Sequence, residues 1–342
     1  MSDKEINYAS YLKLGEGYVG PKVTGLLDCV GQLSSEPEEH LFITVHHGFE
    51  IWFKQILFDF GRIKKNFELS INNPGSVMEK KALGEMPTLI MRCRDLLRML
   101  LGNFQIMESM GQLAFMNFRG KLTGGSGFQS LQFRLIENIF GLKEENRKGQ
   151  TQFNYKEKMK PEQIERVNEA FREQNIFELT QTWLASILDK FGKQKFINSY
   201  QKSVSDMQKA GSNTEHLRCV YDENLFNELR KRDGKNPHTF RNYFTYDGFL
   251  GALLVHQLQA EPEYQIPYQI ITLILDVDEA IMTWRGRHVN MVHRMIGSKP
   301  GTGGTSGYDY LSSTVSDQYK VFWDLFTMST YVIPLVDFKI TK

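Results

Sequence analysis

One run of apolar residues at helical spacing constrains the fold more than any other feature of this chain. It lies within Pro267–Tyr310, and its members recur at intervals of four and three residues. They are Ile270, Ile274, Val277, Ile281, Trp284, His288, Met291 and Met295. Such spacing places all of them on one face of an α-helix, and a face of this length must pack against other protein. The run predicts a long buried helix, capped by Gly297 and ended by Pro300.

His288 is the only strongly polar member of that helical face. A buried imidazole needs a partner, because an unpaired polar group in an apolar setting is unfavourable. Two interpretations stay open from the residues alone. His288 is either a hydrogen-bonded core histidine or an axial ligand to a flat apolar cofactor.

A second apolar face, also interrupted by one histidine, is predicted after Ser35 and Glu38, which fit a capping box. Its members are Phe42, His46, Phe49, Phe53, Ile56, Phe60, Ile63 and Phe67. A third helix is predicted to open at Pro87 and run to Phe118, and the stretch before Pro334 predicts a helix near the C-terminus. Two helices that each carry one inward histidine would suit the two sides of a haem.

Arg119 follows the third helix and precedes a glycine-rich stretch, TGGSGFQS (123–130). Its guanidinium either binds a carboxylate or simply complements a helix end. The second glycine-rich stretch, KPGTGGTSGY (299–308), is either a cradle for an anionic group or an ordinary surface turn. It lacks the order of a nucleotide-binding P-loop.

The bulk composition excludes several classes of function. The chain has 342 residues, with 41 Lys plus Arg against 40 Asp plus Glu, so nothing suggests a nucleic acid partner or an anionic membrane. Its three cysteines are scattered, which favours a reducing, cytoplasmic location, and no stretch reaches the roughly 18 apolar residues of a membrane span. Helical periodicity dominates, and we expect one all-α bundle domain, 1–342, with a peripheral segment at 143–235.

The N-terminal segment carries an aromatic pair, Tyr8 and Tyr11, but is too short to bury a core of its own. These rings must pack on something else, which is either the rest of this chain or another copy of it.

Three long motifs are recognisable. They are EHLFITVHHGFEIWFKQIL (39–57), FRGKLTGGSGFQSLQFRLIEN (118–138) and WRGRHVNMVHRMIGSKPGTGGTSGYDYLSSTVSD (284–317). Through them the chain resembles the tryptophan 2,3-dioxygenase family, in order from Tyr8 to about Pro334 and most weakly between 143 and 235.

The resemblance implies a helical bundle enclosing haem b, with one haem bound non-covalently in each subunit. It implies an oxidoreductase that inserts both atoms of O2 into the pyrrole ring of L-tryptophan, giving N-formyl-L-kynurenine in the first step of the kynurenine pathway. It also implies a homotetramer, built as a dimer of dimers, in which the N-terminal segment is exchanged between subunits.

The resemblance assigns roles to individual residues. His288 matches the axial ligand of the haem iron, His46 the histidine that accepts the indole N–H, and Arg119 the residue that binds the substrate carboxylate. The other matched positions are Thr302 near the ammonium and carboxylate, Phe42 and Phe115 around the indole, Ser126 close to bound oxygen, Trp284 beside the cofactor, and Tyr8 and Tyr11 reaching a neighbour's pocket.

The chain departs from the family pattern at His47, Phe49, Gly124, Gly125 and Thr305. These departures leave tryptophan analogues open as substrates. They also leave open a related outcome in which only one oxygen atom is inserted, as in a tryptophan-utilising haem monooxygenase. A separate rival hypothesis is a non-catalytic protein that binds haem or tryptophan.

Overall fold

The computed structural model describes residues 25, 27–122, 130–147, 156, 159–233, 241–299, 307–336, 338 and 340. Within these ranges the secondary structure is helical and contains no strand, which confirms the predicted all-α class. None of the helices in these ranges is long and apolar enough to cross a membrane.

The first half of the chain forms the helices α3 (Glu38–Asn72), α4 (Val77–Met99), α5 (Leu101–Glu108), α6 (Gln112–Arg119), α8 (Leu131–Phe140), α9 (Glu144–Arg147) and α10 (Pro161–Arg172). The second half forms α11 (Ile176–Phe191), α12 (Lys193–Lys209), α13 (Glu223–Asp233), α14 (Tyr246–Gln257), α15 (Pro262–Ile296), α16 (Gly307–Ser313) and α17 (Trp323–Thr327). Short 3-10 turns lie at Glu215–Val220, Asp317–Tyr319 and Met328–Thr330.

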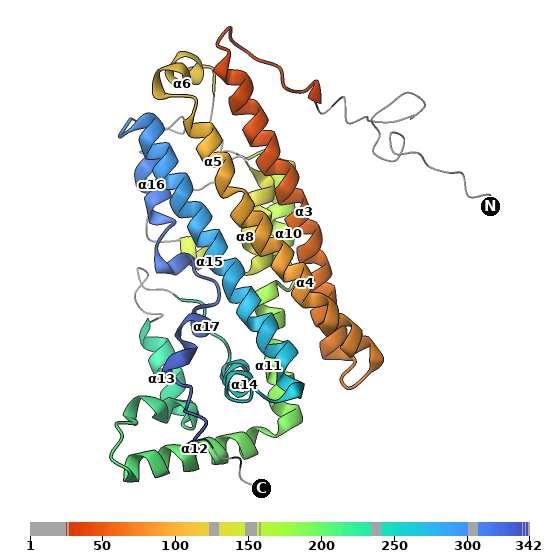
Figure 1. The fold of residues 1–342 in the computed structure, drawn as a ribbon, viewed down its shortest axis with the longest axis vertical. Coiled ribbons are helices and arrows are strands. Elements are labelled where there is room, and N and C mark those ends of the chain that lie inside the picture. The colour runs from red at the N-terminus through yellow and green to blue at the C-terminus, as the bar shows by residue number, and fades with distance from the viewer. Residues whose placement is uncertain are drawn as a thin grey trace, which may run out of the picture.

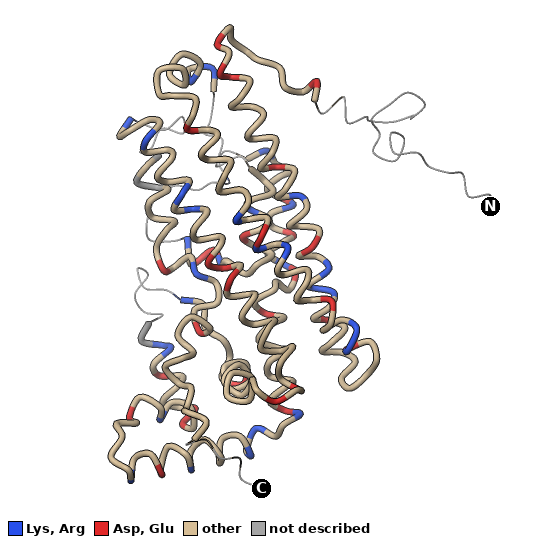
Figure 2. Tube along the Cα trace, in the orientation of Figure 1, with Lys and Arg blue, Asp and Glu red and all other residues tan. Residues whose placement is uncertain are grey.

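The long helices α3 and α15 form the frame of the molecule, and α4 packs against both of them (Figure 1). Helix α12 crosses the lower end of the bundle in this view, and α14 packs against α11. Lysines and arginines are interspersed with acidic residues along the helices rather than gathered on one face (Figure 2).

The predicted central helix is confirmed as α15, which ends as expected at Gly297, where φ is +60° and the backbone N–H bonds to His293. Most of its predicted face is buried in the main core. The exceptions are His288 and Met291, which are only half-buried because they face a pocket. On α15, the polar residue that interrupts the apolar face therefore lies where the packed core gives way to a pocket.

Three local predictions were wrong. Helix α3 is not capped by Ser35, because it begins at Glu38 with Pro37 at the N-cap position and no capping side chain. Glu39 instead accepts the backbone N–H groups of Leu33 and Ser34. The third helix does not open at Pro87 and is not continuous: α4 begins at Val77, one residue after the capping side chain of Ser76, and the path to Phe118 is divided among α4, α5 and α6.

The long C-terminal helix predicted before Pro334 was also wrong, since the structure has α17 and short turns there. A buried carboxylate binds the backbone of this segment where the helix was expected. Asp278 on α15 accepts the backbone N–H groups of Val321 and Phe322 at 2.8 and 2.7 Å. A side chain from another helix thus satisfies donors that a continuous helix would have used internally.

We expect the contact between α14 and α11 to be intolerant of any added side chain at Gly251. A Cβ at this position would overlap the backbone carbonyl of Leu184, which cannot move aside as a flexible side chain would. Gly251→Ala should lower the free energy of unfolding by about 2 to 3 kcal/mol. The measurement is chemical denaturation followed by circular dichroism.

Gly84→Ala on α4 is the matched control. A Cβ there would meet nothing within 4 Å, and the residue is exposed, so this change should raise the free energy of unfolding by roughly 0.5 to 1 kcal/mol. Equal effects of the two substitutions would contradict the close helix contact.

Candidate functional site

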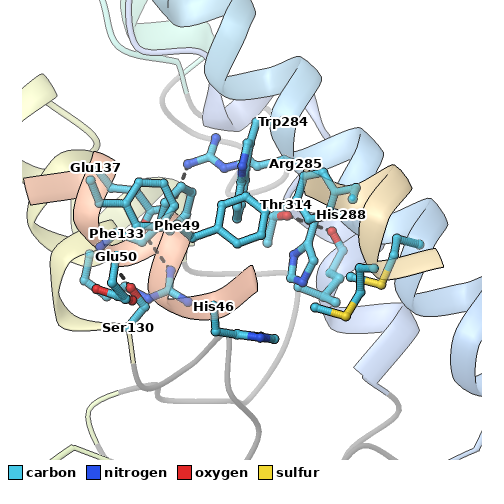
Figure 3. Close-up of a pocket in the computed structure, with 16 residues that line it drawn as sticks. His46, Phe49, Glu50, Ser130, Phe133, Glu137, Trp284, Arg285, His288 and Thr314 are labelled. Carbon is cyan, nitrogen blue, oxygen red and sulfur yellow. Dashed lines mark hydrogen bonds and ion pairs between the residues drawn. The ribbon is translucent and has the colours of Figure 1, made fainter. Parts of the chain in front are cut away.

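A pocket opens between α3, α5, α8 and α15, and its described walls are mostly apolar (Figure 3). It contains about 770 Å³ of space not occupied by atoms, part of which is open to solvent. Helix α3 contributes His46, Phe49, Glu50 and Phe53, and α15 contributes Trp284, Arg285, His288 and Met291. The two histidines predicted from separate helices therefore reach the same pocket.

His46 is half-buried on α3, and its ring lies 4.2 Å from the ring of Phe42. Its Nδ1 is 2.7 Å from the backbone carbonyl oxygen of Phe42, one turn earlier. Because a carbonyl oxygen only accepts, Nδ1 must carry the proton and Nε2 is left as an acceptor. Burial lowers the pKa of His46, which keeps the ring neutral near pH 7.

His288 lies on α15 with its ring 5.3 Å from that of Trp284 and 5.7 Å from that of Phe104. Its imidazole makes no hydrogen bond to any other residue that the structure describes. Burial, and then the neighbouring His46 and Arg134, lower its pKa to about 4. A neutral imidazole with a free nitrogen lone pair is the form that binds a metal ion.

Trp284 stands one helical turn before His288 and is 8% exposed. Its indole contacts the rings of four phenylalanines, which are Phe49, Phe53, Phe104 and Phe133, at centroid distances between 4.6 and 5.8 Å. The indole Nε1–H is buried and has no hydrogen-bond partner within the described part of the chain. Buried donors are usually paired, so this one indicates an acceptor that binds from outside the chain.

A buried ionic cluster forms the wall of the pocket beside Trp284. Glu137 on α8 is bonded by the guanidinium groups of Arg134 (2.8 Å), Arg147 (3.0 Å) and Arg285 (2.6 Å). Burial alone would raise the pKa of Glu137, but the three positive charges outweigh it and hold that pKa well below its ordinary value. The cluster ties α8 and α9 to α15 directly beside the two histidines.

The predicted site residues fall into three groups. His46, Trp284 and His288 line the pocket together. The ring centroids of Phe42 and Phe115 lie 5.8 Å apart, and the ring of Phe42 also contacts that of His46. Arg119 is the last residue of α6; it is half-buried and does not line the pocket. Tyr8, Tyr11, Ser126 and Thr302 lie outside the described residues, as do Gly124, Gly125 and Thr305.

Sequence reasoning missed the polar half of the pocket, namely Glu50, Ser130, Arg134, Glu137, Arg285 and Thr314. One signal was present, because Arg134 and Glu137 stand three residues apart within the apolar stretch LQFRLIENIF. Opposite charges spaced three residues apart in a mainly apolar helix are expected to pair with each other where the helix is buried.

Comparisons with known proteins agree with the motifs. A family model described as tryptophan 2,3-dioxygenase matches residues 2–332. Tryptophan 2,3-dioxygenase A of Danio rerio is 35% identical over 312 residues, covering 87% of this chain and 76% of that protein. The tryptophan 2,3-dioxygenases of Xenopus laevis and Anopheles gambiae are each 36% identical, covering 87% of this chain and 76% and 79% of their own lengths.

We expect Glu137→Gln to destabilise the fold, because it leaves three buried guanidinium groups without their shared anion. The free energy of unfolding at pH 7 should fall by about 3 to 5 kcal/mol. The folded pKa of Glu137 lies below its ordinary value of 4.5, so its contribution is complete above pH 4.5 and declines as the pH falls below it. Denaturation titrations from pH 7 to pH 3 should therefore show that the difference in free energy of unfolding between wild type and variant becomes smaller in acid.

Glu173→Gln is the matched control, because it removes an exposed carboxylate that pairs with Lys64 at 2.7 Å. Its effect should stay below about 1 kcal/mol at every pH. A difference for Glu137→Gln that widened in acid would contradict the assigned direction of the pKa shift.

Proposed function

Because this chain belongs to the tryptophan 2,3-dioxygenase family, we propose that the pocket between α3 and α15 holds haem b, with His288 as the axial ligand of the iron and His46 on the opposite, substrate-facing side. The enzyme is an oxidoreductase that cleaves the pyrrole ring of L-tryptophan with O2 and incorporates both oxygen atoms, giving N-formyl-L-kynurenine. This is the first step of tryptophan catabolism by the kynurenine pathway.

The observation that carries the proposal is the state of the two imidazoles. Both are neutral and face one apolar pocket, but His46 is held by the Phe42 carbonyl whereas His288 makes no hydrogen bond within the described residues. The apolar walls and the unpaired indole N–H of Trp284 suit a flat cofactor with polar substituents. When bound, the haem iron supplies the chemistry that activates dioxygen.

The chain's own residues account for substrate recognition in this proposal. The Nε2 lone pair of His46 accepts the indole N–H of tryptophan, and the rings of Phe42 and Phe115 select a flat bicyclic side chain. Arg119 binds the substrate carboxylate, with Thr302 nearby and Ser126 close to the oxygen. Orientation of the amino acid over the cofactor is then a large part of the catalysis.

We further propose a homotetramer, a dimer of dimers, in which Tyr8 and Tyr11 complete a neighbour's site. Exposed apolar side chains on α3 support an interface between copies, since Ile51 is 46%, Trp52 39% and Phe58 64% exposed. Large exposed aromatic residues on a helix face are typical of association surfaces.

The chain itself is proposed to be one domain spanning 1–342, because one apolar core joins residues from α3 to Phe338 and includes Trp183 of α11. A cytoplasmic location is proposed because the three cysteines, Cys29, Cys93 and Cys219, are all free thiols, as expected in a reducing compartment.

We expect His288→Ala to abolish stoichiometric haem retention while leaving the helical content intact, because Trp284 and Met295 still pack on the same face. Haem titration followed by the Soret band, with circular dichroism on the same samples, measures both quantities. His293→Ala is the matched control, since His293 is exposed on another face of α15 with its ring 4.1 Å from that of Tyr308. A normal five-coordinate spectrum in His288→Ala would refute the assignment of the ligand.

We expect His46→Ala to slow turnover of L-tryptophan without eliminating it. A buried indole N–H that loses its acceptor costs on the order of 1 to 3 kcal/mol, which corresponds to roughly 5- to 150-fold in kcat/KM. The difference in kcat/KM between L-tryptophan and 1-methyl-L-tryptophan should become smaller in this variant, because the methylated indole has no N–H to donate. His47→Ala, one residue further along α3, should keep that difference. A difference unchanged in His46→Ala would show that this imidazole does not contact the indole nitrogen.

A further inference from the structure

The starting point is the unpaired donor in the pocket wall. The Nε1–H of Trp284 is buried without a partner in the described structure, although leaving such a group unpaired costs roughly 1 to 3 kcal/mol. Phe49, Phe53, Phe104 and Phe133 surround the indole, so the ring cannot turn its N–H towards solvent. The fold therefore holds this donor in place for an acceptor that arrives with a ligand.

Two buried arginines line the same pocket as Trp284. Arg134 and Arg285 both line the pocket, and they are 5% and 4% exposed. Both are bonded to Glu137, which also binds Arg147 from α9. Glu137 thus fixes the guanidinium groups in position, and three arginines share its single carboxylate.

The charges divide the pocket into two sides. Glu50 is the other acidic residue of the wall, where Gln132 donates to its carboxylate at 2.8 Å. Figure 3 shows Glu50 and Ser130 together on one side of the pocket, and Trp284 and His288 on another. A negatively charged group of a ligand is therefore favoured near the unpaired N–H of Trp284 and the buried arginines of the lining, away from the carboxylate of Glu50.

We propose that the Nε1–H of Trp284 and the guanidinium of Arg134 together bind a carboxylate arm of the haem that is proposed to sit on His288, with Glu137 as a positioning residue for Arg134. The inference rests on the proposed haem site and adds the group that orients the cofactor in it. Trp284 precedes His288 by four residues, a rise of about 6 Å along the helix axis. Its N–H would therefore be near enough to contact a carboxylate arm of a haem held by His288.

The test compares ferric haem with its dimethyl ester, which keeps the macrocycle and the iron but has no carboxylate charge. Dissociation constants for both are measured on the full-length protein by absorbance titration. The wild type should bind the acid at least tenfold more tightly than the ester, because a charge-assisted contact to a carboxylate contributes about 1.5 to 3 kcal/mol. Trp284→Phe, which removes the donor and keeps the ring, should lower that ratio, and Arg134→Met should lower it further.

Arg147→Met is the matched control, because Arg147 also binds Glu137 but does not line the pocket. It should leave the acid-to-ester ratio at the wild-type value. The comparison on the wild type needs no substitution, so a variant that fails to fold does not prevent a decision.

The outcomes separate this inference from the proposed function. Equal affinity of the wild type for acid and ester would overturn the carboxylate anchor and leave the haem proposal intact. A ratio lowered as much by Arg147→Met as by Arg134→Met would overturn the assignment to Arg134 and point to collapse of the cluster. If the wild type binds neither compound, the haem site itself is wrong and the anchor is refuted with it.

Discussion

The geometry of the site depends on one buried carboxylate. Glu137 holds Arg285 of α15 at 2.6 Å while it also binds Arg134 and Arg147, which belong to α8 and α9. Arg285 directly follows Trp284 and stands three residues before His288, so the ion pair fixes the rotation of α15 about its own axis. An isolated buried charge would be strongly unfavourable, so each of the four groups depends on the others for its stability. The apolar face supplies most of the attraction between the helices, and the cluster fixes their angular register.

This register explains why two histidines from distant parts of the chain meet. Helices α3 and α15 are each 35 residues long, and both pack on α4. Along α3 the aromatic rings of Phe49 and Phe53 contact Trp284 of α15. His46 lies one turn before Phe49 on α3, and His288 lies one turn after Trp284 on α15. Both histidines therefore line the same pocket as these contacting rings.

The sequence predicted those features of the fold and site that repeat along one element. The periodic face of α15, its end at Gly297 and the histidines that interrupt two faces all follow from local spacing. The breaks between α4, α5 and α6, and the short elements near the C-terminus, depend on contacts such as those of Asp278, which no local pattern contains. The bond between Glu137 and Arg285 was missed for the same reason, because the two residues lie 148 positions apart. Arg119 was predicted as a site residue, and the structure places it at the end of α6 outside the pocket wall.

The two imidazoles differ in how their rings are held. Both are kept neutral by burial, so neither repels a cation and each offers a lone pair to the pocket. His46 has committed Nδ1–H to the carbonyl of Phe42, which fixes the ring and aims a single acceptor at whatever donor enters. A ring held so firmly suits recognition of an N–H group at a defined position. His288 has no such bond among the described residues, and one of its nitrogens can bind a metal ion while the other takes a partner that the cofactor or solvent supplies. In the function proposed above, the fixed ring of His46 recognises the substrate, and His288 would bind the haem iron beside which the substrate is placed.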